Sequence, residues 1–144
     1  MNNKFSRQTQ YIERQEGKLA YSDFGGDGQP VIMLPGMGAL RNEYRFLVPF
    51  LTTAGYRAIT VDLRGHGESS VPWKTYDVPS MGCDIIALVE HIDAGAAHLI
   101  GTSFAAAPVV WQPQSAPTAP IRSCSSIHLC VTSRLTRLWV HCSG

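Results

Sequence analysis

The chain contains 144 residues, a length that predicts one domain with a hydrophobic core of its own. Its 12 basic side chains nearly balance 11 acidic ones, so charge gives no reason to expect a nucleic acid or another polyanion as partner. The N-terminus lacks the continuous apolar run of a secretory signal, and no segment approaches the roughly 20 apolar residues of a membrane span. We therefore expect a cytoplasmic protein that does not act at a membrane, with four cysteines present as free thiols.

The first third of the chain predicts an antiparallel pair of strands and then a buried one. Residues 9–15 and 18–23 flank Glu16-Gly17 and are typical of a hairpin. A glycine-rich turn follows, and residues 31–34 are then uniformly apolar, as in strands that are buried on both faces.

Helices and strands alternate in the middle of the chain. Residues 43–54 and 81–92 repeat apolar side chains at helical spacing, and Ser80 is the expected N-cap of the second helix. Residues 58–61 and 99–100 are short apolar runs typical of buried strands. The apolar helical positions are Phe46, Leu47, Phe50 and Leu51, then Ile85, Leu88, Val89 and Ile92. The alternation predicts an α/β fold in which parallel strands follow the hairpin and helices cover both faces.

The run from His98 to Ala105 has the pattern of a nucleophile elbow. A strand-like stretch breaks at Gly101-Thr-Ser-Phe-Ala105 and continues into helix-prone sequence, so the Ser103 side chain would stand exposed at the end of a strand. Gly101 and Ala105 are small, as a tight strand-to-helix turn requires. The alternative is an ordinary turn serine or helix N-cap, for which serine is also well suited.

Two upstream loops give this pattern its context. Pro35-Gly-Met-Gly38 follows the first buried strand, and Asp62-Leu-Arg-Gly-His-Gly-Glu-Ser69 follows the second. In this order the three segments resemble the α/β-hydrolase family, in its serine hydrolase branch. The resemblance covers about residues 16–111, the N-terminal portion of such a protein.

The resemblance implies roles for individual residues. Ser103 would be the nucleophile, and the backbone N–H groups of Met37 and Phe104 would form the oxyanion hole. A structural role is implied for the loop and turn residues that match the family pattern. These are Gly36, Asp62, Arg64, Gly65, Gly67, Ser69, Gly101 and Ala105.

The activity implied by the resemblance is hydrolysis of a small ester or a related acyl or carbon–carbon bond, through an acyl-enzyme at Ser103. The substrate would be a small molecule, and no metal or organic cofactor is implied. A serine at the elbow argues against the dehalogenase and epoxide-hydrolase branches, whose nucleophile is a carboxylate. The sequence does not indicate an oligomeric state. The alternative is a non-catalytic relative that binds a ligand or a partner.

No acid and no histidine of a catalytic triad can be identified in the chain. In the family both follow the nucleophile, yet no Asp or Glu occurs after Asp93. We expect His66 to be a solvent-side turn residue rather than the base. The other histidines, His91, His98, His128 and His141, are equally poor candidates. A serine without an oriented base is a weak nucleophile, so we expect the chain to be truncated and inactive.

The chain changes character at Gln112. All acidic residues and every lysine precede it, and Pro113, Pro117 and Pro120 would stop the helix that follows the elbow. We therefore expect a partial hydrolase domain over residues 1–111 and an atypical tail over 112–144 that arises from a frameshift or a mis-called gene. The alternative is a genuine C-terminus, since residues 127–131 alternate like a strand. Such a strand could cover the edge that truncation would otherwise expose.

Overall fold

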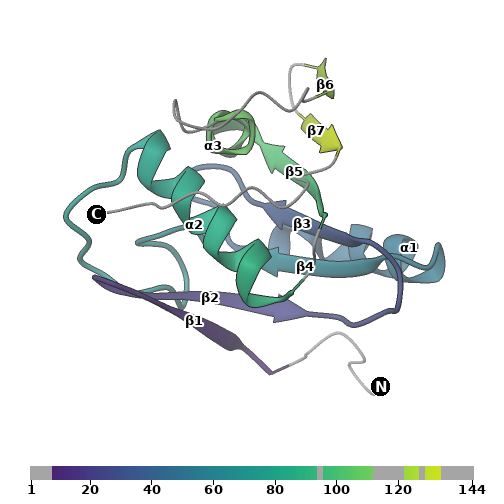
Figure 1. The fold of residues 1–144 in the computed structure, drawn as a ribbon, viewed down its shortest axis with the longest axis horizontal. Coiled ribbons are helices and arrows are strands. Elements are labelled where there is room, and N and C mark those ends of the chain that lie inside the picture. Colours follow the sequence, from purple (N-terminus) through teal and green to yellow (C-terminus); the bar gives the residue numbers. More distant parts are fainter. Residues whose placement is uncertain (1–7, 94–95, 112–121, 127–128, 134–144) are drawn as a thin grey trace.

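The structure is a computed structural model that describes residues 8–93, 96–111, 122–126 and 129–133. Its sheet has the strand order β1-β2-β4-β3-β5-β7-β6 (Figure 1). The strands are β1 (Gln10–Arg14), β2 (Gly17–Asp23), β3 (Pro30–Leu34), β4 (Arg57–Val61), β5 (His98–Thr102), β6 (Arg122–Ser126) and β7 (Leu129–Ser133). The helices are η1 (Arg41–Phe46), α1 (Leu47–Thr53), α2 (Val78–His91), η2 (Ser103–Ala105) and α3 (Ala106–Val110), where η marks a 3-10 helix.

The hairpin and the parallel strands confirm the predicted fold class. β1 and β2 pair antiparallel from Gln10↔Tyr21 to Arg14↔Gly17, and β2 continues antiparallel onto β4. β4, β3 and β5 are mutually parallel, and every residue of β3 is buried. The register pairs Leu34 with Gly101, so the loops that follow β3 and β5 begin side by side at one edge of the sheet.

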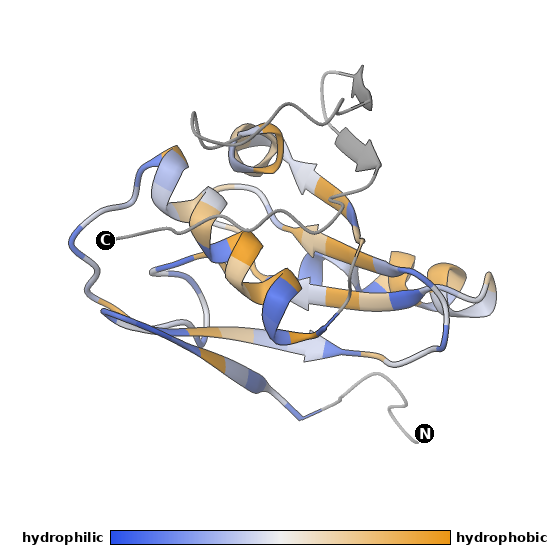
Figure 2. Cartoon of the chain, viewed as in Figure 1, coloured by the Kyte–Doolittle hydropathy of each residue, from blue (hydrophilic) through white to orange (hydrophobic). Residues whose placement is uncertain are grey.

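Helices cover both faces of the sheet. Ile32 and Leu34 pack in one cluster with the apolar face of α2, while Val31 and Met33 pack in a second cluster with Val48 of α1. Successive strand residues point to opposite faces, so α2 and α1 lie on opposite sides of β3. Figure 1 shows this arrangement, and Figure 2 shows hydrophobic residues gathered along the central strands and on α2.

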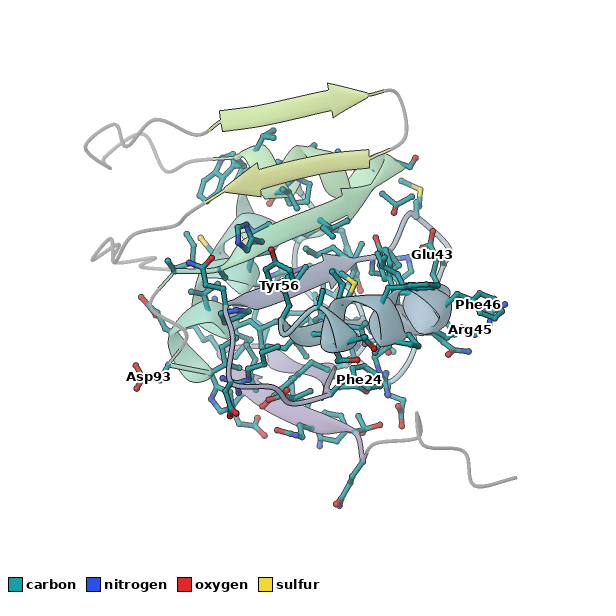
Figure 3. The ribbon with its side chains drawn as sticks, turned by 90° about the vertical axis from the view of Figure 1, so that its right-hand side faces the viewer. Phe24, Glu43, Arg45, Phe46, Tyr56 and Asp93 are labelled. Atoms are coloured by element: carbon teal, nitrogen blue, oxygen red, sulfur yellow. The ribbon has the colours of Figure 1, made fainter. Side chains whose placement is uncertain are left out.

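The helix predicted over residues 43–54 is shorter and turned differently. It begins as η1 and becomes α-helical only at Leu47, so Phe46 and Phe50 are 69% and 74% exposed. Tyr44 and Val48, four residues apart, are buried in their place, with Leu47 and Leu51 partly buried. Figure 3 shows Phe46 and Arg45 together, pointing away from the sheet, and the Arg45 guanidinium lies 4.2 Å from the Phe46 ring centroid. The inward positions predicted from the spacing are therefore confirmed for Leu47 and Leu51 and wrong for Phe46 and Phe50.

The helix predicted over residues 81–92 begins three residues earlier. Asp77 is its N-cap, and its carboxylate accepts a hydrogen bond of 2.8 Å from Ser80 N–H. Ser80 is therefore the donor to the N-cap and not the N-cap itself. Pro79 lies in the first turn of α2, where a residue without an N–H is tolerated. The predicted inward positions are confirmed. Ile85, Leu88, Val89 and Ile92 are all buried.

The outer side of β5 is paired. β7 runs antiparallel to β5 from Leu99↔Thr132 to Thr102↔Leu129, and β6 pairs with β7. The backbone of residues 129–133 thus pairs with the outer edge of β5. A strand of the tail at this edge is what the alternative of a genuine C-terminus predicted. The rest of the tail lies outside the described residues.

Two further expectations concern the surroundings of the chain. None of the helices in the described part of the chain combines the length and the apolar character needed to span a bilayer. Cys83 on α2 is disulfide-bonded, so the expectation of a free thiol is wrong for this residue.

Candidate active site at the carboxyl edge of the sheet

Ser103 lies at a sharp turn between β5 and α3. It is exposed and has a φ of +53°, one of two positive values among the described non-glycine residues. A serine in this left-handed region is held there by its surroundings, since the conformation costs an L-residue about 1–2 kcal/mol. Thr102, not Ser103, is the N-cap of η2, and it makes no side-chain capping bond. The geometry is therefore that of a strand–turn–helix elbow and not of a capping serine.

The small residues around Ser103 are required by packing. A Cβ on Gly101 would lie 2.5 Å from the Ala105 carbonyl oxygen and 2.9 Å from Val109 Cγ2. Ala105 itself is fully buried. The helix that follows the elbow folds back so closely on β5 that neither position has room for a larger side chain.

The loop after β3 runs beside the elbow. A Cβ built on Gly36 would lie 3.6 Å from Ser103 Cβ, which places the two turns in van der Waals contact. Gly38 has a φ of +78°, and the Met37 side chain between the two glycines is 68% exposed. The loop therefore presents its backbone, with little side-chain cover, next to Ser103.

The N–H groups of this loop are not equivalent. Gly36 N–H donates to Glu43 Oε2 over 3.3 Å, and Gly38 N–H donates to His66 Nε2 over 3.2 Å. Within the described residues, no acceptor is found for the Met37 N–H that lies between them. An uncommitted backbone donor of this kind can bind an oxygen that carries negative charge.

Phe104 supplies a second donor on the other side of the turn. It is the second residue of η2, and the first N–H groups of a helix have no acceptor within that helix. The Met37 and Phe104 amides therefore belong to the two turns that meet at Ser103. Both backbone N–H groups can stabilise an oxyanion whatever the side chains of these two residues are.

His66 has a role that the sequence did not reveal. Its ring is half-buried, Nδ1 lies 3.1 Å from the Arg64 carbonyl oxygen, and Nε2 accepts from Gly38 N–H. The proton therefore sits on Nδ1, where it bonds to Arg64. Both ring nitrogens are engaged in holding two loops together, and neither is free to take a proton from Ser103.

Tyr44 is the other residue that sequence reasoning missed. Its hydroxyl donates to the Leu34 carbonyl oxygen over 2.7 Å and lies 2.7 Å from Thr102 Oγ1. Burial raises the pKa of Tyr44 to about 12. A tyrosine at an apolar helical position predicts only a core residue, so no signal in the sequence marks this contact with the elbow strand.

Asp62 organises the loop that follows β4. The carboxylate is 1% exposed and accepts from Arg41 N–H at 2.7 Å, from the Arg41 guanidinium and from Glu68 N–H at 3.2 Å. Gly67 has a φ of +52°, and a Cβ there would collide with the same carboxylate. Ser69 Oγ donates to the Asp62 carbonyl oxygen and accepts from Ala20 N–H.

Arg64 joins the same loop to α2. Its Nε donates to Asp84 over 2.8 Å, and both side chains are buried. The guanidinium also lies 4.5 Å from the Trp73 ring centroid and donates to the Thr75 carbonyl oxygen. At Gly65, φ is +75° and a Cβ would lie 2.6 Å from a carbon of the Tyr76 ring. These contacts fit the structural role that the resemblance implies for the loop.

A metal site is absent from the described part of the chain. No group of three or more His, Cys, Asp or Glu side chains is arranged to hold a metal ion there. One pocket lies in the core between β4 and α2, where residues such as Leu63, Ile85 and Leu88 line it, and Ser103 is not among its lining residues.

Comparison with known proteins agrees with this geometry. Residues 29–133 match the family model described as alpha/beta hydrolase fold. The chain belongs to the α/β-hydrolase family. Its sequence is 33% identical over 97 residues to the AB hydrolase superfamily protein YisY of Bacillus subtilis, a match that covers 67% of this chain and 36% of YisY.

Solved α/β hydrolases show the same fold. The bromoperoxidase from Bacillus anthracis matches with a TM-score of 0.66 and 31% identity, over 71% of this chain and 37% of that one. The esterase EaEST from Exiguobacterium antarcticum matches with a TM-score of 0.64 and 32% identity, over 71% and 38%. Other relatives are named as epoxide hydrolases. The chain thus spans about a third of the length of these relatives.

Proposed function

We propose that this chain carries the nucleophile and the oxyanion hole of a serine hydrolase that acts on a small ester or a related acyl or carbon–carbon bond. The observation that carries the proposal is the juxtaposition of an exposed, left-handed Ser103 with the uncommitted Met37 N–H. Names of relatives that include an esterase support the same class of reaction.

The reaction would proceed in two steps. Ser103 Oγ attacks the substrate carbonyl carbon as its proton passes to a base, and the N–H groups of Met37 and Phe104 stabilise the oxyanion that forms. The tetrahedral intermediate then collapses, the leaving group departs with the proton that the base had taken, and an ester of Ser103 remains. Water then attacks that ester, which releases the acid and restores the serine hydroxyl. A serine nucleophile does not fit the mechanism in which a carboxylate attacks an epoxide or a halide.

The base is the missing part of this proposal. His66 is occupied by Gly38 and Arg64, His91 lies edge-on to Tyr21, and His98 bonds to Gln29. No carboxylate follows Asp93 in the sequence. We therefore propose that this polypeptide, truncated relative to a complete hydrolase, has at most residual activity by itself.

A second candidate function is binding without catalysis. The same lack of a carboxylate after Asp93 favours it, because a scaffold that keeps the elbow without a base can still hold a ligand. In both cases we infer a small-molecule ligand, since the net charge of +1 offers no attraction for a nucleic acid. A cytoplasmic location stays a prediction, and the disulfide of Cys83 argues against it.

A fluorophosphonate probe distinguishes the two candidates. The enzyme requires labelling that maps to Ser103, is lost in Ser103→Ala and persists in the control Ser80→Ala, which removes a hydroxyl that lies 2.7 Å from Thr75 Oγ1. Sharp thermal unfolding without any labelling would contradict the hydrolase and support the binding protein. Labelling that survives in Ser103→Ala would overturn the assignment of the nucleophile.

The division at Gln112 is a proposal of its own. We propose that residues 1–111 form the hydrolase part and that the tail after them arises from a frameshift. Sequencing the encoding DNA across Val110 to Thr118 tests this. A second open frame that continues to an Asp and a His supports it, whereas a single open frame contradicts it.

A further inference from the structure

Tyr44 links the two strands that lead into the proposed site. Its hydroxyl lies 2.7 Å from the carbonyl oxygen of Leu34, the last residue of β3, and 2.7 Å from Oγ1 of Thr102, the last residue of β5. Met37 follows Leu34 by three residues, and Ser103 follows Thr102 directly. One side chain therefore contacts the start of both turns that meet at the serine.

The direction of these two hydrogen bonds is determined. A phenol has one proton, and the Leu34 carbonyl can only accept, so Tyr44 donates to Leu34 and accepts from the Thr102 hydroxyl. Burial raises the pKa of Tyr44 to about 12, which keeps the phenol protonated at neutral pH. The result is a directed chain from Thr102 through Tyr44 to the backbone of β3.

The link lies where the sheet no longer holds the two strands together. The parallel pairing of β3 with β5 ends at Leu34↔Gly101, and the chains separate into their turns beyond it. Tyr44 is 6% exposed, and its neighbour Glu43 accepts from Gly36 N–H. η1 thus contacts the strand end through Tyr44 and the loop through Glu43.

We propose that Tyr44 is a positioning residue that, through Thr102, sets the separation of the Met37 and Phe104 N–H donors. The inference rests on the proposed function of Ser103. Oxyanion donors act only within a few tenths of an ångström of their ideal distance, and a displacement of about 1 Å can cost about a hundredfold in rate. A residue that ties the two turns together therefore controls the reactivity of the serine without touching the substrate.

The test compares four variants in the full chain. Tyr44→Phe and Thr102→Val each remove one hydroxyl, Thr102→Ser retains it, and the double variant lacks both. We expect the rate at which a fluorophosphonate labels Ser103 to fall about tenfold in Tyr44→Phe and in Thr102→Val. Thr102→Ser should stay within about twofold of the parent, and the double variant should be no slower than the slower single one. Tyr56→Phe is the matched control, because its ring packs edge-on against His98 at the other end of the strands.

Amide hydrogen exchange of Gly36 and Ala106, followed by NMR, completes the test, because these N–H groups are hydrogen-bonded in the loop after β3 and in the elbow. Both amides should exchange faster in both single variants, since each hydroxyl holds both turns. Unchanged labelling in Tyr44→Phe, additive losses in the double variant, or faster exchange at only one turn would overturn the positioning role. If the parent protein is not labelled at Ser103, the hydrolase proposal fails, and the exchange data alone decide whether Tyr44 links the turns.

Discussion

The loops after β3 and β4 both end a parallel strand at the same edge of the sheet, yet their polar groups are used differently. In the loop after β4, Asp62 and Arg64 are buried and every buried side-chain polar atom in the described structure has a partner. In the loop after β3, Met37 N–H has no acceptor among the described residues, and its side chain is exposed. The comparison teaches that a loop whose buried polar groups all have hydrogen-bond partners is structural. A loop with a backbone N–H that has no acceptor among the described residues is the candidate site.

The largest effect should come from the buried ion pair of the structural loop. Asp84→Ala leaves Arg64 without its partner in the core, and Arg14, which also donates to Asp84, loses its bond. We expect a loss of about 3–5 kcal/mol in the free energy of unfolding, measured by urea denaturation. Glu90→Ala, an exposed change on the same helix, is the control. A loss below about 1 kcal/mol would show that the loop does not depend on this pair.

Two glycines allow the loops to be compared directly. Gly67 and Gly38 both have positive φ, but a Cβ at Gly67 meets the Asp62 carboxylate, whereas a Cβ at Gly38 meets nothing within 4 Å. Gly67→Ala should cost about 3 kcal/mol, and Gly38→Ala only the backbone strain of about 1 kcal/mol. Thermal and urea unfolding of the two variants measure the difference. Equal losses in the free energy of unfolding would contradict the distinction between a crowded loop after β4 and an open loop after β3.

The stability of the site should depend on alkaline pH through Tyr44. Burial raises the pKa of Tyr44 to about 12 from its ordinary value of 10, so the folded protein binds the proton more tightly than the unfolded chain. This contribution is fully present below pH 10 and is lost as the pH rises from 10 towards 12, and it amounts to about 2 kcal/mol. Unfolding of the parent and of Tyr44→Phe between pH 8 and 12 measures it. An identical pH dependence in the two proteins would contradict the assignment.

The smallest effect should be a gain in stability at the elbow. Ser103 adopts a φ of +53°, which glycine tolerates without strain, so Ser103→Gly should raise the free energy of unfolding by about 1 kcal/mol while it removes the nucleophile. Ser103→Ala retains the Cβ and should show no gain. If both variants have the stability of the parent, the turn is not strained, and this argument for a functional elbow is lost.

Patterns along the chain predicted much of the fold and the position of the elbow. The alternation of apolar runs and helical spacing indicated the strands and α2, because a buried face needs apolar residues at the period of its element. The glycines at 65, 67 and 101 were recognisable because turns of this kind exclude a Cβ. In residues 43–54 the prediction failed for Phe46 and Phe50 only, and the segment begins as a 3-10 helix with Phe46 turned outward.

The sequence by itself determined that the chain belongs to the α/β-hydrolase family, that a serine stands at the turn after β5, and that no carboxylate follows Asp93. Only the tertiary structure decided which polar groups are hydrogen-bonded: His66 accepts from Gly38, Tyr44 joins Leu34 to Thr102, and Met37 N–H has no acceptor among the described residues. The physical reason is that hydrogen bonds such as these join residues 10 to 58 positions apart. Local periodicity and turn propensity act over a few residues, so they carry no information about such partners.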